Sequence, residues 1–461
     1  MEIAEEYARY ATELTFDTLP PSVVEHAKKL ILDIVANAIG GHDWMESGPV
    51  IVGGVRALDR GRSGATVLAT GEQMAPEWAS LVNGAMAHSL DYDNHHAAGV
   101  IHAGASVVSS ALAAAEEKGA DGRDLISAVV VGYEIACRLA MALGPHSSHE
   151  MGFHPTGTCA TFAASAIIGR LRGVEPEVIV DAMGLNGSQA AGSMQYVVNG
   201  AWNKRMHPGL AAHGGFIAVA LAEAGFLGAA DVFEGDQGFL QGYALRPAPD
   251  RATATLGSEY ETLNVAIKPY SLCRYTHQTL ELLIGLVGTS EVSSSDIESI
   301  HIEMPTYGLQ LVGSPIEAKR HPESPVDAQF SAPFAAALAL TEGRAGLDVF
   351  TRVIQEGFSD EFRRLMSVTD VSAAEDLDAV HPEFWPGRVT VSTSSGTIEL
   401  EAKHMRGEAE IPMSFDEVAA KFVELSPNLA GGERTRVIET ARHLEHHTVD
   451  QLLAPLRGDS T

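Results

Sequence analysis

Residues 87–108 read AHSLDYDNHHAAGVIHAGASVV, and the rest of the chain is best understood from this stretch outward. Four histidines and two aspartates stand here among apolar and small residues, at positions 88, 91, 93, 95, 96 and 102. The flanking segments 74–87 and 103–118 both have the residue spacing of helices with few charges. Ionisable groups between two buried helices are costly to desolvate unless they are paired, and such crowding is typical of perturbed pKa values. We therefore predict that residues 87–108 form the floor of an active site.

The composition limits the classes of function that the protein can have. The chain has 461 residues, enough for two domains, and a formal net charge of −29. This acid excess argues against nucleic acid or an anionic membrane surface as a partner, and it means that a site for an anionic substrate must gather its own cations. Three widely spaced cysteines without a CxxC pair argue against a disulfide framework or a zinc ribbon. The acidic start MEIAEE and the lack of an uncharged span with flanking anchors predict a cytoplasmic protein with no membrane partner.

Periodicity predicts a mainly α-helical protein with a smaller α+β insertion. Helical spacing is found at 3–14, 22–39, 74–87, 103–118, 121–143, 175–192 and 209–225, and an Ala-rich helix is expected between residue 158 and residue 172. Strand-like alternation follows at 299–304, 388–392 and 397–401, with a hairpin signal at 394–396, and helical spacing returns after Pro412. We expect a large all-helical domain, 1–266 and 405–461, and a small α+β domain, 267–404. Small and apolar residues cover more helix faces than one domain can bury, which favours a homodimer.

Three further stretches carry residues suited to chemistry. His154 lies in GFHPTGT at a loop-to-helix junction, and helix N-termini attract anions, although a plain capping role would also explain it. Lys204 in NKRMHPG has no acidic neighbour in sequence, but a surface lysine is an equally good interpretation. The stretch IKPYSLCRYTH, 267–277, stands where the helical and α+β regions meet, and small-molecule sites often form at domain interfaces. Cys273 in that stretch could be a nucleophile, but buried structural cysteines are commoner.

A metal site is a weaker hypothesis for the histidine-rich stretch. The residue types at His88, Asp91, Asp93, His95 and His96 suit a divalent cation. However, two adjacent histidines on a regular element cannot both face one ion, and the spacing matches no helical metal motif. We therefore predict no metal at this stretch.

Six motifs in sequence order resemble the MmgE/PrpD family along nearly the whole chain. They are NGAMAHSLDYDNHH…HAGA, GYEIACRLA, GFHPTGT, KRMHPGLAAHGG, IKPYSLCRYTH and VDAQFSAPFAAALAL. The resemblance implies a large helical domain, a smaller α+β lid domain inserted before the C-terminal helices, a homodimeric assembly, and activity without a cofactor on small di- or tricarboxylates. Known activities in the family are dehydration of 2-methylcitrate, decarboxylation of cis-aconitate and epimerisation of iminodisuccinate.

The resemblance also implies a set of pocket residues. The family's catalytic positions match Asp91, His102, His154, Lys204 and Lys268. Substrate contacts are expected from His95, Tyr270, Arg274 and His277. The family pattern D-x-D-D-T-H reads here Asp91-Tyr92-Asp93-Asn94-His95-His96, so that His95 replaces a pocket threonine, and the H-P pattern reads His102-Ala103. These departures leave the identity of the substrate open.

The first functional hypothesis is a hydro-lyase that dehydrates a 2-methylcitrate-like hydroxy acid. Removing a proton α to a carboxylate is slow unless cations stabilise the growing charge, and Lys204, Lys268 and Arg274 would supply them. His102 is expected to be the base, His154 the acid, and Asp91 the group that orients an imidazole. Decarboxylation of an unsaturated tricarboxylate and epimerisation α to a carboxylate share the same carbanion-like state and stay open. A carboxylate- or metal-binding protein without turnover is a third alternative.

Overall fold

The computed structural model describes residues 2–61, 63–144, 147–198, 200–289 and 292–458, and it divides the chain into two compact units. Unit 1 comprises residues 1–267 and 414–461, and unit 2 comprises residues 268–413. Unit 2 is therefore an insertion in the sequence of unit 1. The fold is mainly α-helical, as the sequence predicts, with one sheet of four strands and two short strand pairs in the described residues.

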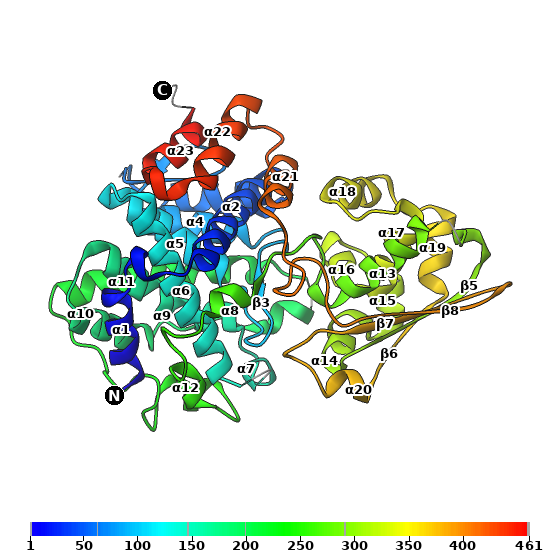
Figure 1. Ribbon diagram of the computed structural model, residues 1–461, viewed down its shortest axis with the longest axis horizontal. Helices are drawn as coiled ribbons and strands as arrows, with labels where there is room; N and C mark the ends of the chain where they lie inside the picture. The colour runs from blue at the N-terminus through cyan, green and yellow to red at the C-terminus, as the bar shows by residue number, and fades with distance from the viewer. Residues whose placement is uncertain (1, 62, 145–146, 199, 290–291, 459–461) are drawn as a thin grey trace. The chain divides into compact units, whose positions relative to one another are not determined.

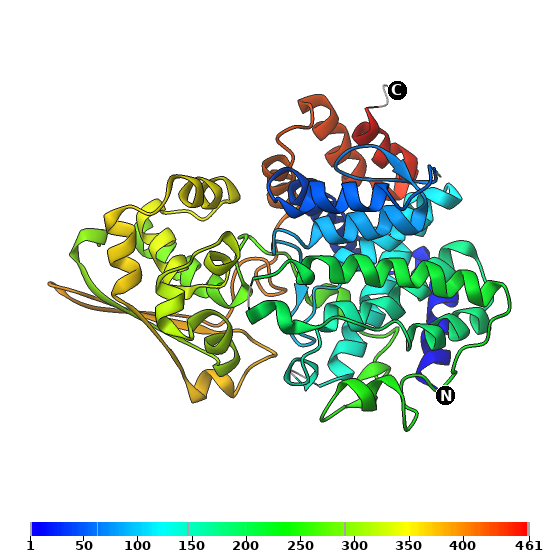
Figure 2. The same ribbon diagram turned by 180° about the vertical axis from the view of Figure 1, so that it is seen from behind.

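Unit 1 is a helical body with two very short strand pairs (Figures 1 and 2). Its helices are α1 (Ile3–Glu13), α2 (Pro21–Asp43), α3 (Ser47–Arg56), α4 (Pro76–Ala87), α5 (Gly104–Lys118), α6 (Gly122–Ala142), α7 (Ser147–Glu150), α8 (Pro155–Thr158), α9 (Ala160–Arg172), α10 (Pro176–Asn186), α11 (Asn203–Glu223), α12 (Phe239–Tyr243), α21 (Phe415–Leu425), α22 (Gly431–Arg442) and α23 (Val449–Arg457). Its strand pairs are β1 (Ala65–Thr66) with β2 (Gln73–Met74), and β3 (His95–His96) with β4 (Val265–Ala266).

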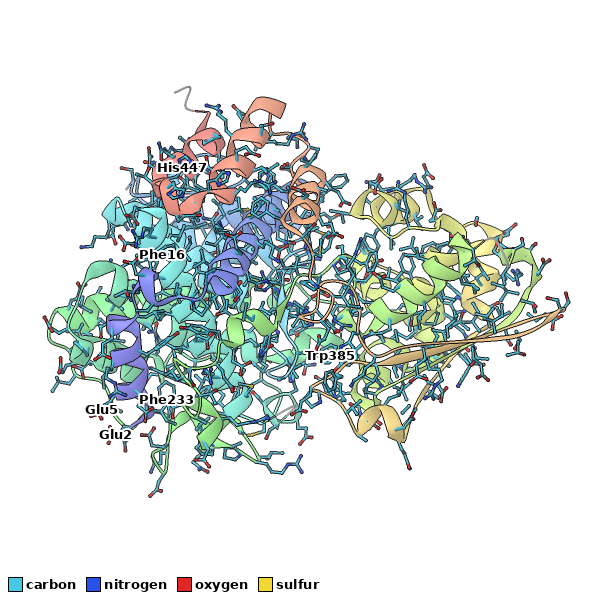
Figure 3. All side chains as sticks on the ribbon, viewed as in Figure 1. Glu2, Glu5, Phe16, Phe233, Trp385 and His447 are labelled. Carbon is cyan, nitrogen blue, oxygen red and sulfur yellow. The ribbon has the colours of Figure 1, made fainter. Side chains whose placement is uncertain are left out.

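The core of unit 1 is built from helices that are apolar on nearly every side. Every described residue of α5 from Gly104 to Ala115 is buried, and α6 is buried along almost its whole length. By length and composition α6 is also the one described helix that could cross a membrane, but its most apolar window is wholly buried, as a core helix would be. Aromatic rings fill another part of the core. Phe233, which is labelled in Figure 3, packs edge-on against Tyr7 with ring centroids 5.8 Å apart.

Glycines allow a close approach between helices α4 and α11 in unit 1. A Cβ atom on Gly209 of α11 would lie 2.2 Å from the carbonyl oxygen of Leu81 in α4, and one on Gly84 would lie 2.9 Å from Cα of Gly209. Any larger residue at either position would force the two helices apart. The contact fixes the position of α11, and with it the side chains of its first turns, relative to the segment that follows α4.

Unit 2 is a four-stranded sheet with helices packed on it. The strands are β5 (Ile297–Met304), β6 (Thr369–Ala373), β7 (Gly387–Thr393) and β8 (Gly396–Ala402), in the order β6-β5-β7-β8, with only the β5/β6 pair parallel. The helices are α13 (His277–Gly288), α14 (Thr306–Gly308), α15 (Ile316–Arg320), α16 (Pro325–Gln329), α17 (Ala332–Glu342), α18 (Leu347–Glu356), α19 (Asp360–Ser367) and α20 (Glu375–Asp378). Helix α13 packs on β7 and β8, α17 on β6, and α19 on β5.

Several predicted boundaries are wrong in informative ways. Helix α2 does not end before Gly40 but continues through Gly40 and Gly41 to Asp43. Gly41 leaves room for the backbone of α4, because a Cβ atom on Gly41 would lie 1.9 Å from the Met86 carbonyl oxygen. Helix α10 ends at Asn186 and does not continue to residue 192. Helix α11 begins at Asn203, six residues before the predicted start at 209, and includes Pro208 in its second turn. The 394–396 hairpin is confirmed, with Thr393 paired with Gly396.

Candidate active site

The loop between α4 and α5 carries the histidine-rich stretch in a constrained conformation. Asp91 and Val100 both have positive φ angles, 51° and 49°, which are uncommon for residues other than glycine and occur often at functional sites. His95 and His96 form the short strand β3. The His96 ring is hydrogen-bonded to Glu261 at 2.9 Å and also accepts from the Gly99 amide. Backbone pairing and these side-chain bonds hold the loop in one shape.

Asp93 is a fully buried carboxylate between two imidazoles of this loop. Its Oδ2 atom lies 2.8 Å from Nδ1 of His88, and its Oδ1 atom lies 3.5 Å from Nδ1 of His102. The imidazoles of His88 and His102 meet edge-on, with ring centroids 5.1 Å apart. Because Nδ1 of each ring faces Asp93, the Nε2 atoms are the ones free to meet a ligand.

The charges in this cluster follow from burial and hydrogen bonding. Burial opposes ionisation of Asp93, but the imidazoles of His88 and His102 outweigh it and hold the pKa of Asp93 well below its usual value. Burial lowers the pKa of His88, although Asp93 acts in the opposite direction. Asp93 is therefore an anion that accepts an Nδ1–H hydrogen bond from a neutral His88.

A cation from α11 reaches the same loop. The ammonium group of Lys204 forms an ion pair with Asp91, and burial of Lys204 is outweighed by this carboxylate, so that the pKa of Lys204 is raised. Lys204 lies in the first turn of α11, and the Gly84–Gly209 contact brings that turn to the end of α4. The lysine is thus kept charged at the site, and the surface interpretation of Lys204 is wrong.

Two further histidines complete the cluster. His154 immediately precedes α8, and its backbone amide donates to the Gly192 carbonyl at 2.8 Å. Its ring stacks on His88 with centroids 5.7 Å apart, and its Nδ1 lies 3.1 Å from Nδ1 of His207 in α11. Burial lowers the pKa of His154 well below its usual value, with His207, His88 and Lys204 acting in the same direction. Thr156 of α8 ties this junction to the loop by accepting the His102 amide at 3.0 Å.

A second buried network holds the backbone and side chains of the loop between α4 and α5. Lys421 of α21 lies 2.7 Å from Asp33 of α2 and donates to the Tyr92 carbonyl at 2.7 Å. Asn94 donates to Asp33 at 3.0 Å and accepts from the Tyr133 hydroxyl at 3.0 Å. These contacts hold the residues on both sides of Asp93, so the C-terminal helices contribute to the site although they are more than 300 residues away in sequence.

The remaining predicted residues, Lys268, Tyr270, Arg274 and His277, belong to unit 2, where all four are buried. Tyr270 donates to Glu281 at 2.7 Å, and its ring meets that of His277 with centroids 5.4 Å apart. Arg274 is paired with Glu408, hydrogen-bonds Gln278 at 3.0 Å and lies 5.3 Å from the centroid of the Trp385 ring. Burial lowers the pKa of Arg274 to about 9. Roles of these residues in substrate binding stay predictions.

Metal-ligating atoms are grouped at two places among the described residues. Donor atoms of His88, Asp93 and His102 lie within 4.8 Å of one another, and so do those of His404, Glu408 and Glu410 in unit 2. The first group differs from the set considered from the sequence, because it includes His102 and leaves out Asp91, His95 and His96. In this group Nδ1 of His88 is hydrogen-bonded to Oδ2 of Asp93, and Nδ1 of His102 lies 3.5 Å from Oδ1 of Asp93, which is the arrangement expected of an acid–base group.

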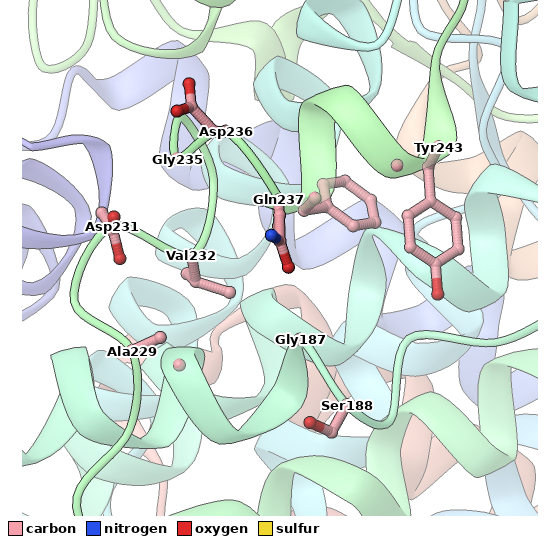
Figure 4. Close-up of a pocket in the computed structure, with 13 residues that line it drawn as sticks. Gly187, Ser188, Ala229, Asp231, Val232, Gly235, Asp236, Gln237 and Tyr243 are labelled. Carbon is pink, nitrogen blue, oxygen red and sulfur yellow. The ribbon is translucent and has the colours of Figure 1, made fainter.

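A cavity elsewhere in unit 1 does not suit a carboxylate ligand. It has a volume of about 330 Å³ and is lined by α10, α12 and the segment between residues 229 and 238 (Figure 4). Among the described residues that line it, the only ionisable side chains are Asp231, Asp236 and Tyr243. Acidic groups without a cation repel anions, so this cavity is not the site for a di- or tricarboxylate.

Comparisons with known proteins agree with the sequence motifs. The MmgE/PrpD N-terminal domain model matches residues 5–252, and the MmgE/PrpD C-terminal domain model matches residues 270–446. The chain belongs to the MmgE/PrpD family. The cis-aconitate decarboxylase of Aspergillus terreus is 26% identical over 95% of this chain and 92% of its own length. The cis-aconitate decarboxylase-like protein oryM of Aspergillus oryzae is 26% identical over 99% and 98%, and the cis-aconitate decarboxylase of Mus musculus is 24% identical over 91% and 86%.

Four of the residues matched to the MmgE/PrpD pattern gather in unit 1. Asp91, His102, His154 and Lys204 come from three separate segments, because Asp91 and His102 share the loop after α4, and they are linked through the ring of His88 and the ion pair of Lys204. His95 joins them with its ring centroid 5.9 Å from that of His102. Sequence reasoning missed Asp93 as the shared carboxylate and His207 as the partner of His154. The spacing of Asp93 from His88 was visible, but nothing in the sequence indicated that α11 would begin before His207.

Proposed function

We propose that this member of the MmgE/PrpD family is a lyase that acts on a small di- or tricarboxylate without a metal or organic cofactor. The observation that carries the proposal is the cluster of Asp93, His88, His102, His154 and Lys204. A positively charged lysine beside several neutral imidazoles suits a reaction that removes a proton α to a carboxylate. The lysine stabilises the extra charge, and an imidazole takes the proton.

The first reaction that we propose is dehydration of a 2-methylcitrate-like hydroxy acid. A substrate carboxylate would meet the ammonium group of Lys204, which is already held by Asp91. Lys268 and Arg274 of unit 2 are the further cations proposed for the other carboxylates. An imidazole then removes the α-proton, and a second imidazole protonates the departing hydroxide so that water leaves.

The depressed pKa of His154 favours an assignment of the two imidazoles opposite to that made from the sequence. Burial and the neighbouring cation keep His154 unprotonated at neutral pH, which suits a base. His102 directs Nδ1 at the anionic Asp93 and leaves Nε2 to meet a ligand, which suits a proton donor. We therefore propose His154 as the base, His102 as the acid and Asp93 as the group that orients His102, with Asp91 holding Lys204.

Decarboxylation of a cis-aconitate-type substrate is a second candidate, and the names of the relatives favour it. The A. terreus and M. musculus relatives are both cis-aconitate decarboxylases, and each aligns with more than nine-tenths of this chain. Loss of CO₂ would leave the same carboxylate-stabilised carbanion, which His102 could protonate. Epimerisation needs only the proton removal and its return, so the same groups could perform it.

One assay separates these reactions. Purified protein in EDTA is incubated with 2-methylcitrate, citrate, cis-aconitate and iminodisuccinate, while double-bond formation, CO₂ release and exchange of the α-hydrogen with deuterated water are measured. We expect turnover of one substrate, and a Lys204→Met variant should abolish it, which controls for enzymes carried over from the expression host. Binding of these acids without any product or exchange would show a binding protein and contradict the proposal. Activity that EDTA removes and a divalent metal restores would contradict the cofactor-independent mechanism.

A further inference from the structure

We propose that His207 is a positioning residue of this site, which shares one proton with His154 and holds it while Nε2 of His154 carries a substrate proton. His207 lies in α11, one turn after Lys204, and its side chain is buried. The inference rests on the proposed function, because it concerns how His154 acts as a base.

The geometry between the two rings requires a shared proton. The Nδ1 atoms of His154 and His207 lie 3.1 Å apart. Two ring nitrogens form a hydrogen bond only when one carries a hydrogen and the other offers a lone pair. If both rings are neutral, one is therefore protonated on Nδ1 and the other on Nε2, and the two tautomers are complementary.

The surroundings make a second proton on His154 unfavourable. His88 stacks on its ring at 5.7 Å, His149 of α7 lies 6.4 Å away, and Tyr196 lies 6.2 Å away, all between ring centroids. The cation of Lys204 acts on both His154 and His207, and beyond His88 lie His102 and the anionic Asp93. Burial lowers the pKa of His207 to about 4, with His88 and Lys204 acting in the same direction, and it lowers the pKa of His154 well below its usual value. An imidazolium is thus disfavoured on both rings.

The proton transfer then balances as follows. His154 begins with its hydrogen on Nδ1 and a lone pair on Nε2, and His207 begins with its hydrogen on Nε2 and a lone pair on Nδ1. As the substrate C–H bond breaks, Nε2 of His154 takes the proton, the Nδ1–H bond of His154 breaks, and that hydrogen bonds to Nδ1 of His207. His154 stays neutral, and the positive charge on His207 is balanced by the carbanion. Return of both protons restores the starting state.

Three variants test the relay. His207→Asn places an amide where Nδ1 was, so it can keep a hydrogen bond to His154 but cannot take a proton. His207→Leu removes both abilities. His213→Asn is the matched control, because His213 lies on the same helix but packs on Trp78, with ring centroids 4.6 Å apart. We expect kcat of His207→Asn and His207→Leu to fall alike, by at least about tenfold, with KM little changed and the acidic limb of the kcat–pH profile displaced. The His213→Asn variant should keep the kcat of the unaltered protein. If His207→Asn also keeps that kcat, the relay is wrong.

A measurement on the unaltered protein does not depend on activity or on the folding of variants. Long-range ¹H–¹⁵N correlation of ¹⁵N-histidine-labelled protein at neutral pH reports which ring nitrogen carries the hydrogen. The signals of the pair are assigned by their change when His207 is replaced by Asn. We expect complementary neutral tautomers for His154 and His207. Two rings with the same tautomer would overturn the inference even if turnover is found, whereas complementary tautomers without any turnover would contradict only the proposed function.

Discussion

The two aspartates of the loop after α4 have different contacts, and substitution should distinguish them. Asp93→Asn leaves one imidazole facing an NH₂ group, so the fixed Nδ1–H of His88 or His102 loses its acceptor. We expect kcat to fall by roughly a hundredfold or more with unchanged overall fold. Asp91→Asn instead leaves Lys204 without its buried counter-ion, so KM should change more than kcat. Steady-state kinetics with circular dichroism test both variants, and a larger loss of kcat in Asp91→Asn would reverse the two roles.

His26 makes stability depend on pH. Its Nε2 donates to the Val265 carbonyl at 2.9 Å, and burial lowers its pKa from 6.5 to about 4. Between pH 4 and pH 6.5 the unfolded chain binds a proton at His26 that the folded chain does not. The contribution of the neutral His26 ring to the free energy of unfolding is therefore complete above pH 6.5 and is lost as the pH falls toward 4. His26→Gln keeps a donor without the titration and should lower the slope of unfolding free energy by up to about 1.4 kcal/mol per pH unit in this window.

Urea unfolding at several pH values measures this slope. The matched control is His446→Gln, because the His446 side chain is 76% exposed. An unchanged slope in His26→Gln would show that the buried ring is protonated in the folded state.

Helix α11 shows what the sequence could and could not predict. Its Ala- and Gly-rich second half has clear helical spacing, but the Pro208-Gly209 pair indicated a helix start at residue 209. The helix instead begins at Asn203 because tertiary packing of Gly209 against α4 stabilises the earlier turns. That extension places Lys204 and His207 one turn apart on one helix. The candidate residues could be found from the sequence, whereas the partner of each depended on contacts between distant segments.

Strand β6 was missed for a similar reason. Its sequence, TDVSA, has only one strongly β-forming apolar residue and is mostly half-buried or exposed. It forms a strand because it pairs in parallel with β5 at the sheet edge, which short-range periodicity does not reveal. By contrast, β7 and β8 alternate clearly and join through a two-residue turn.

The helix contact at Gly209 should be intolerant of a single methyl group. Gly209→Ala would place Cβ 2.2 Å from the Leu81 carbonyl oxygen, so α11 must move and carry Lys204 away from Asp91. We expect destabilisation of about 1–3 kcal/mol and a raised KM, measured by urea unfolding and kinetics. Gly53→Ala in α3 is the control, since nothing lies within 4 Å of its Cβ, and it should be neutral or stabilising. Equal effects of both variants would show that the α4–α11 contact is not critical.

At the scale of the whole molecule, the surface of unit 1 carries an apolar face along α11 and α3. Met206, Leu210, Ile217 and Leu221 of α11 are all at least 36% exposed, at spacings that keep them on one side of the helix. A groove of about 730 Å³ lies between this face and α3 and is lined mostly by apolar residues, among them Val50 and Trp78. A chain with net charge −29 repels its own copies, so a mostly apolar face without acidic residues in its groove is where two copies can meet. We propose that this face forms the homodimer expected from the Ala- and Gly-rich helices.

The dimer proposal predicts a solution mass of twice 48.8 kDa by light scattering. Leu210→Glu should yield the monomer, because a carboxylate on the apolar face would be desolvated in the interface without a partner. Ile411→Glu is the control, since Ile411 is 48% exposed but lies in unit 2, and it should leave the mass unchanged. Because Lys204 and His207 are on the same helix as Leu210, loss of the dimer should also lower kcat by freeing the first turns of α11. A monomeric mass for the unaltered protein, or an unchanged mass for Leu210→Glu, would show that this apolar face is not the dimer interface.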